Sequence, residues 1–462
     1  MTMMRRSRPI VGNTQRLHAM LRRIVLQREC IKVLIMGGSV THGFNLGGDG
    51  TQRPYHVHFI KWLNVKYPCE GSGHEMLGMK APTGGITSKV LLSLLTHNLE
   101  FYNLIDMIFV EVAPNDPFIG ENTERHDKTK KTTDVIQWYT EVIVRNLLRA
   151  RTPSPPAVMY VESAWNGYKW LQAMEKPTPM TVAQSFDGIA QLAHQQVLFY
   201  YQIPTVSAVD VLWPLAMHNR SAYWRGHEYS WMWNNLDRCC HPTHEGHMLL
   251  ALLLAYNMEE EIRRWIHEPL RAIEEDVTMT RALEPPWLLT AKEDAEMGLR
   301  AAFSDMNFML GAPEPSAIGH NEGWSWYADS KNKTGLIATR VGAHLSLKIN
   351  VPAAAKVVIG FLQSYNTLTP AAWWVDEVAE GSTQCPQSAD EPTRGRQYTI
   401  DPLKVNEKVS VYNSVSQPIQ PTSAKDGIHY IHFCLIRRQK SDEINGKFKL
   451  MTVKVSADLT AG

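Results

Sequence analysis

Apolar runs alternate with helical patterns over the first 265 residues. Four short runs are almost continuously apolar, as is typical of strands buried on both faces of a parallel sheet; they cover 32–36, 105–112, 157–161 and 204–209. Elsewhere, apolar residues recur every three or four positions, which predicts helices beginning near 17, 55, 135, 183 and 245. Strands alternating with helices predict a parallel sheet covered on both faces. Functional residues are then expected on loops at the carboxyl ends of the strands.

The pattern changes after about residue 270. Proline-rich stretches at 284–286 and 311–315 bracket a segment that we interpret as a connection. Beyond it, apolar and polar residues alternate with a period of two, most clearly over 345–351, and this predicts an antiparallel β-sandwich. We therefore predict an α/β domain over residues 1–275, a connection over 276–320 and an accessory β-sandwich domain over 321–462.

Length and composition agree with a folded protein of two domains. The chain has 462 residues, of which 44% are hydrophobic and 20% charged, so it is not a disordered protein. Its formal net charge is 47 − 46 = +1, which argues against a nucleic-acid partner. The longest apolar run, Met248–Tyr256, is far shorter than the ~18 residues of a membrane span, so we expect no transmembrane segment.

The arginine-rich N-terminus has no acidic residue before Glu29 and faintly resembles a transit peptide. We prefer another interpretation, because apolar residues from Leu17 to Val25 have helical spacing and predict an amphipathic helix. Six cysteines are too few for a disulfide scaffold in a chain of this length. The neighbours Cys239 and Cys240 are interpreted as two separate thiols.

The first predicted strand runs into Met36-Gly-Gly-Ser-Val-Thr-His-Gly43. Glycines at the end of a strand allow a sharp turn and bring backbone N–H groups close to a reacting atom. Ser39 is therefore a candidate nucleophile. A phosphate-binding turn or an ordinary strand-to-helix loop would produce the same local pattern.

Two later segments favour the interpretation of Ser39 as a nucleophile. The second strand ends in Val110-Glu-Val-Ala-Pro-Asn-Asp116, where the side-chain amide of Asn115 could donate to an oxyanion. The segment Cys240-His-Pro-Thr-His-Glu-Gly-His247 opens the last helix and offers His241 as a general base for a serine hydroxyl. The segment 82–88 precedes a helix and offers free backbone N–H groups.

These segments, in this order, resemble the SGNH (GDSL-type) hydrolase superfamily over residues from about 12 to 265. Gly37-Gly38-Ser39 matches the family's first block in its Gly-Gly-Ser form. Gly85 is the best match to the oxyanion glycine of the second block, with Gly84 as the alternative.

The third and last blocks of the family match in part. Asn115 stands in the third, Gly-x-Asn-Asp block, where Ala113 replaces the glycine. His241 matches the second half of the last, Asp-x-x-His-Pro block, but its aspartate position holds Arg238. Asp237 is one residue further back and is our candidate for the third member of a triad.

The resemblance implies a flavodoxin-like α/β/α sandwich that hydrolyses esters, often on polysaccharides, without a metal or organic cofactor. Residues 323–365 resemble an accessory β domain attached to such hydrolases in algae and related protists. The expected enzyme is a serine esterase that removes acyl, above all acetyl, groups from a carbohydrate or small-molecule ester. Ser39, His241 and Asp237 would be catalytic, and Ser39, Gly85 and Asn115 would form the oxyanion hole.

Three alternatives remain open. An O-acyltransferase acting on a glycan could use the same residues, and an inactive member of the fold could serve to bind glycans or partners. A metal site at His241, His244 and His247 is also conceivable, although their spacing is not that of the zincin signature. We interpret His244 and His247 as a polar helix start and a packing residue, and His42 as a pocket wall. The tryptophans of 223–233 could stack on a sugar ring or only pack.

Overall fold

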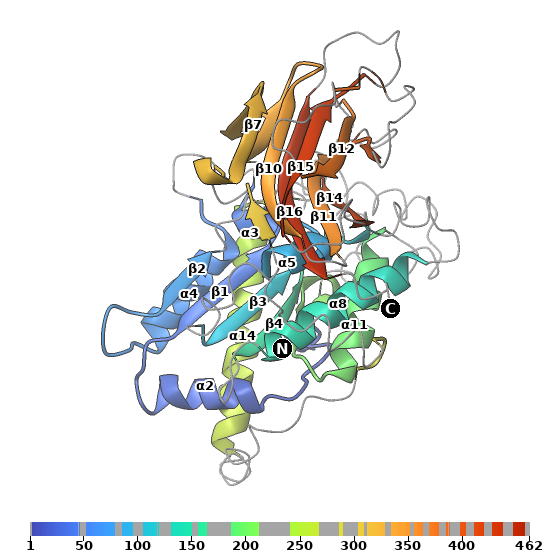
Figure 1. Cartoon of the computed structure of the whole chain (residues 1–462). Coiled ribbons are helices and arrows are strands. Elements are labelled where there is room, and N and C mark those ends of the chain that lie inside the picture. Colours follow the sequence, from blue (N-terminus) through green and yellow to red (C-terminus); the bar gives the residue numbers. More distant parts are fainter. Residues whose placement is uncertain are drawn as a thin grey trace. The chain divides into compact units, whose positions relative to one another are not determined.

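The chain forms two compact units in the computed structural model, and Figure 1 shows their helices and strands. The first unit includes residues 1–79 and 86–298, and the second includes 299–462. The structure describes residues 2–44, 46, 52–78, 86–95, 105–117, 119, 131–149, 156–163, 186–211, 241–267, 286–289, 304–308, 312–328, 334–351, 355–363, 369–377, 385–386, 388, 398–402, 411–419, 427–437 and 447–457.

The first unit contains a five-stranded parallel sheet in the order β2-β1-β3-β4-β5. Its strands are β1 (Lys32–Gly37), β2 (Glu75–Gly78), β3 (Met107–Glu111), β4 (Ala157–Glu162) and β5 (Thr205–Ser207). This order is that of flavodoxin-like folds. The four predicted strands are confirmed, and almost every residue in β1, β3, β4 and β5 is buried. The edge strand β2 was not predicted from the sequence.

Helices cover both faces of this sheet (Figure 1). One face packs against α2 (Gln15–Val25), α4 (Tyr55–Lys66) and α14 (His244–His267), whose buried side chains form one cluster with Val33, Phe109 and Met159. The other face is covered by α5 (Ser88–Leu95), α8 (Thr132–Arg149) and α11 (Phe186–Tyr200), which pack in sequence, α5 on α8 and α8 on α11. The ring of Tyr160, whose side chain alternates with Met159 along β4, contacts His194 of α11. The predicted α/β/α arrangement is therefore confirmed, as is the amphipathic helix near the N-terminus.

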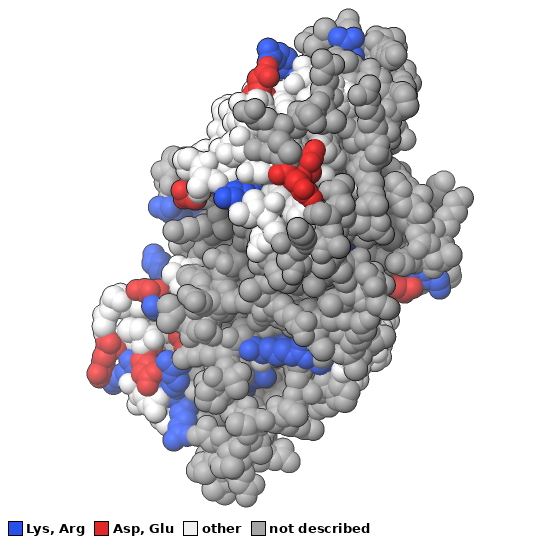
Figure 2. Space-filling model, viewed as in Figure 1, with Lys and Arg blue, Asp and Glu red and all other residues white. Residues whose placement is uncertain are grey.

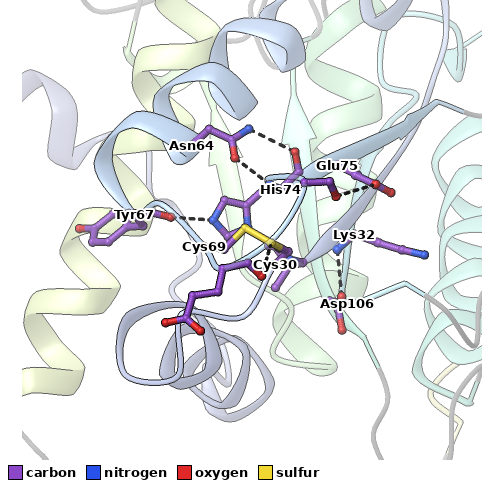
Figure 3. Close-up of a disulfide and its surroundings, with 11 residues drawn as sticks. Cys30, Lys32, Asn64, Tyr67, Cys69, His74, Glu75 and Asp106 are labelled. Carbon is purple, nitrogen blue, oxygen red and sulfur yellow. Dashed lines mark hydrogen bonds between the residues drawn. A yellow bond between two sulfur atoms is a disulfide. The ribbon is translucent and has the colours of Figure 1, made fainter.

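A disulfide joins Cys30, just before β1, to Cys69, between α4 and β2 (Figure 3). The buried ring of His74 lies beside it, where Nδ1 accepts a hydrogen bond from the Ile31 backbone and Nε2 donates to the Tyr67 carbonyl. The side-chain amide of Asn64 bonds both the N–H and the C=O of His74. These contacts join the segment just before β1 to the segment just before β2. The cysteine count alone did not predict this bridge.

The second unit is built from two antiparallel sheets. One has the order β13-β12-β15-β10-β7, and the other has the order β14-β11-β16-β9-β8, with β6 also paired to β16. The strands are β6 (Ser304–Asn307), β7 (Ile318–Glu322), β8 (Trp324–Ala328), β9 (Thr334–Ala338), β10 (His344–Val351), β11 (Ala355–Gln363), β12 (Ala371–Asp376), β13 (Tyr398–Ile400), β14 (Val411–Ile419), β15 (Gly427–Leu435) and β16 (Phe448–Ala457).

One apolar core joins the two sheets of the second unit. Leu345 and Trp373 from the first sheet share it with Ile359 and Leu450 from the second, so the predicted β-sandwich is confirmed. A second disulfide, Cys385–Cys434, ties β15 to the segment after β12. Strands β6 and β7 begin inside the range that the sequence assigned to a connection, and the exact domain limits stay a prediction.

Charges of both signs are mixed on the surface drawn in Figure 2. Over α2, α4 and β2, basic side chains lie among acidic ones, in keeping with the net charge of +1. Within the part of the chain that the structure describes, no helix has the length and apolar character required to cross a membrane.

Candidate active site

Ser39 is the first residue of the four-residue helix α3 (Ser39–His42), directly after β1. Two glycines make the turn before it possible. A Cβ at Gly37 would overlap the side chain of Thr41 and lie 2.8 Å from the Glu111 carbonyl oxygen. A Cβ at Gly38 would lie 2.8 Å from Nδ2 of Asn115. At Gly37 the backbone of Glu111 excludes a side chain, and at Gly38 a Cβ would require the Asn115 amide to move. The Gly-Gly-Ser pattern thus reflects crowding at the end of β1.

His241 reaches Ser39 from the segment just before α14. Its Nε2 lies 2.8 Å from Oγ of Ser39, across 202 residues of sequence. The ring of Phe44 packs on the imidazole with the centroids 4.6 Å apart. Pro242 follows at once, and α14 begins only at His244, so His241 stays on the loop. Ser39 is 8% exposed, which leaves its hydroxyl largely shielded from water.

Asn115 lies on the loop after β3, the strand next to β1. Its side-chain nitrogen packs against Gly38, the residue directly before Ser39. The backbone of Ile86, just before α5, is near the same point, because a Cβ on Gly38 would stand 3.8 Å from the Ile86 nitrogen. The structure thus brings two of the predicted site residues next to each other and places Asn115 beside their turn.

A buried carboxyl supports the turn from below. Glu111, at the end of β3, accepts hydrogen bonds from the hydroxyls of Thr41 at 2.9 Å and Ser163 at 2.5 Å. Its backbone carbonyl accepts the N–H of Gly38 at 3.3 Å. Burial raises the pKa of Glu111 to about 7, against the opposing effect of these hydrogen bonds. A carboxyl with a raised pKa therefore lies beside the turn that carries Ser39.

We expect Glu111→Gln to change how the stability of the protein depends on pH. The pKa of Glu111 rises on folding from 4.5 to about 7. Protonated Glu111 therefore adds to the free energy of unfolding fully below pH 4.5, and this stabilisation is lost as the pH rises through 7. Glutamine does not titrate, so the variant does not lose this stabilisation. Its free energy of unfolding, relative to the wild type, should increase by roughly 2–4 kcal/mol between pH 4.5 and 8. Urea unfolding at both pH values measures this difference, and a constant difference would contradict the assignment.

Two further histidines, His244 and His247, contact residues of α4. His247 is buried in α14, where its Nδ1 accepts a hydrogen bond from the Tyr55 backbone; burial, and then neighbouring histidines, lower its pKa to about 3. His244 begins α14, and its ring packs edge-on against His58 at 5.2 Å. His241, not His42, contacts the Ser39 hydroxyl.

The histidines of α14 do not gather into a metal-ligand group. Among the described residues, such a group occurs only at His344, Cys385 and Cys434, where the two cysteines form a disulfide. His241 bonds Ser39, while His244 and His247 pack against different partners on α4.

Some of the predicted site residues lie outside the described part of the chain. These are Gly85, its alternative Gly84, and Asp237, together with Arg238, Cys239, Cys240 and the tryptophan-rich segment 223–233. Their roles stay predictions.

The sequence did not single out several buried polar residues around the site. Glu111 is a charged residue at the end of the apolar strand β3, and this charge was the signal that could have drawn attention to it. Asp116 follows Asn115 directly, and its carboxylate bonds His194 of α11. No residue near His194 in the sequence indicates that contact.

The comparisons with known proteins bear on the fold. No protein-family model matches the chain, and no curated protein sequence matches it. A solved structure of a two-domain esterase (CEX) active on acetylated mannans matches with a TM-score of 0.57 and 16% identity, covering 98% of this chain and 98% of that chain. A structure of such an esterase co-crystallised with mannopentaose matches equally well, over 99% of both chains.

A smaller solved structure matches part of the chain. The lipase Lip_vut3 from a goat rumen metagenome aligns with 49% of this chain and 97% of its own, at a TM-score of 0.34 and 13% identity. The two-domain matches, by contrast, extend over both units. This chain therefore shares the fold of a two-domain esterase, an α/β unit with a parallel sheet followed by an antiparallel β-sandwich.

Proposed function

We propose that the chain is a serine esterase that hydrolyses acyl esters, above all acetyl esters, on carbohydrate. One observation carries this proposal: Nε2 of His241 lies 2.8 Å from Oγ of Ser39, on loops at the carboxyl edge of a parallel sheet. A hydroxyl and an imidazole at hydrogen-bond distance are the nucleophile and base of acyl transfer.

The reaction proceeds in two steps. Oγ of Ser39 attacks the ester carbonyl while Nε2 of His241 accepts the hydroxyl proton. His241 then returns that proton to the departing sugar alkoxide, which leaves Ser39 acylated. In the second step His241 deprotonates a water molecule, which attacks the acyl carbonyl. Oγ of Ser39 then leaves and takes the proton back from His241, which releases the carboxylic acid and restores the free serine. Asp237 is our proposed third member, orienting the imidazole through Nδ1.

The tetrahedral intermediates of both steps carry a negative oxygen. We assign its stabilisation to the backbone N–H of Ser39, the side-chain amide of Asn115 and the backbone N–H of Gly85. The contact of Asn115 Nδ2 with Gly38 supports the role of the amide, because Gly38 directly precedes the nucleophile.

The fold likeness supports a substrate class. The matched two-domain esterase acts on acetylated mannans, and the likeness extends over both units of this chain. An acetylated polysaccharide is therefore the substrate that we propose for this chain.

Acetate release tests the proposal. The full chain, incubated with acetylated mannan, is expected to release acetate, which an enzyme-coupled assay or proton NMR measures. Aryl acetates should be cleaved faster than aryl esters with longer acyl chains. The Ser39→Ala variant serves as the matched control.

Unacetylated mannooligosaccharides added to the assay distinguish hydrolysis from transfer. Hydrolysis predicts free acetate and oligosaccharides of unchanged mass, whereas a transferase would add about 42 Da per acetyl group to them. If neither free acetate nor acetylated oligosaccharide forms from any ester tested, the esterase proposal is wrong.

A further inference from the structure

Four polar side chains are buried together behind the loop that carries Asn115. They are Asp116, which follows Asn115, Ser88 in the first turn of α5, Glu162 at the end of β4, and His194 in α11. The side chains of Asp116 and His194 are 0% exposed, and that of Glu162 is 1% exposed. The mechanism above does not use any of them.

His194 is held between two carboxylates. Its Nε2 donates to Oδ2 of Asp116 at 2.8 Å, and its Nδ1 donates to Oε1 of Glu162 at 3.1 Å. Because both ring nitrogens face acceptors, both carry a proton and the ring is an imidazolium. Burial alone would lower the pKa of His194, but the two carboxylates outweigh it and raise the pKa to about 10. The charge is therefore present throughout the neutral range.

Asp116 links this imidazolium to the residues around Ser39. Its Oδ1 accepts the Ser88 backbone N–H at 2.5 Å, and its Oδ2 also accepts the Ser88 hydroxyl. Ile86, two residues before Ser88, and Asn115, one residue before Asp116, both approach Gly38. The buried group thus connects the two segments that meet at the turn before the nucleophile.

A purely stabilising role explains this arrangement poorly. Burying three charged groups costs desolvation energy that their mutual attraction only repays in part, and an apolar cluster of similar volume often stabilises a protein as well. What a fully bonded charged group offers instead is a fixed geometry, because every partner has a defined direction.

We propose that His194 is a positioning residue, which acts through Asp116 to hold the Asn115 amide in place for the oxyanion. The inference rests on the proposed esterase function. It adds a residue from α11, and a charged group, to a site otherwise built from the loops after β1 and β3 and before α14.

A double-mutant cycle with Asn115 tests this role. We expect His194→Gln to lower kcat for an aryl acetate by about 10- to 100-fold with KM changed less than about twofold. Asn115→Ala should lower kcat by about 10²- to 10³-fold. In the double variant, the second substitution should add little to the first, because His194 acts through the residue already removed.

His74→Gln is the matched control. His74 is also a buried histidine of the first unit bonded through both ring nitrogens, but it lies beside the Cys30–Cys69 disulfide (Figure 3). Its substitution is expected to lower the melting temperature and to leave kcat within about twofold of the wild type.

Ser88→Ala is a milder test if His194→Gln fails to fold. Removing this hydroxyl should lower kcat by about 3- to 10-fold, an effect that should also vanish in the Asn115→Ala background. If the loss of kcat in His194→Gln or in Ser88→Ala multiplies in full with the loss in Asn115→Ala, the positioning role is wrong. A wild type without esterase activity, or a fully active Asn115→Ala variant, would instead overturn the proposed function or its oxyanion assignment.

Discussion

Ser39→Ala is expected to abolish ester hydrolysis while the protein keeps its fold. The substitution removes the hydroxyl that we propose as the nucleophile, and we expect kcat to fall by about 10⁵- to 10⁶-fold. The fold should survive, because the side chain is small and its hydroxyl contributes one hydrogen bond, to His241, worth about 1 kcal/mol. Initial rates with an aryl acetate and thermal unfolding followed by circular dichroism measure the two effects.

Ser7→Ala is a suitable control for this variant. Ser7 is fully buried in the same unit and bonds the Met4 carbonyl and the Asn257 amide, away from the candidate site. The control should lose stability at least as much as Ser39→Ala and keep its activity. If Ser39→Ala retains more than a trace of activity, the nucleophile has been misassigned.

His241→Ala is expected to have the next largest effect. Without the base, the Ser39 hydroxyl keeps its proton, and we expect kcat to fall by about 10⁴- to 10⁶-fold. His244→Ala should cost far less, since this residue begins α14 and its ring packs against His58 instead of Ser39. The pair differs by only three positions, so steady-state rates of both variants test the loop geometry directly.

Asp237→Asn completes this comparison. An intermediate loss of activity is expected if the carboxylate orients His241, and almost none if the site works as a Ser–His dyad. Should His244→Ala prove more damaging than His241→Ala, the assignment of the base is wrong.

The sequence predicts best the strands whose burial leaves a clear pattern of apolar residues. Strands β1, β3 and β4 are covered on both faces and therefore read as apolar runs, while β10 is buried on one face and alternates. The edge strand β2, Glu75–Gly78, has neither pattern in its four residues, so only its pairing with β1 reveals it.

The candidate site was predictable where its chemistry has a local signature. Glycines before a serine, and a histidine before a proline at a helix start, mark Ser39 and His241 in the sequence itself. Asp116 and His194 have no such signature, because they bond partners 28 to 78 residues away in the sequence. Their role depends on the register of β3 against its neighbours, which composition and spacing do not specify.

The same limit applies to the disulfides. Pairing requires Cα atoms within several ångströms, and the fold brings those of Cys30 and Cys69 to 5.1 Å and those of Cys385 and Cys434 to 5.6 Å. The count and spacing of the cysteines along the chain carry no information on these distances.

Covalent labelling by a fluorophosphonate tests the central claim most directly. A serine activated by a neighbouring histidine attacks the phosphorus, which expels fluoride as the oxygen–phosphorus bond forms. Intact-mass spectrometry of the full chain should therefore show one adduct, and peptide mapping should locate it on Ser39. The adduct should be absent from Ser39→Ala and strongly reduced in His241→Ala. A wild-type protein that stays unlabelled, or carries the adduct on another residue, would contradict the assignment of Ser39 and His241 as a working nucleophile and base.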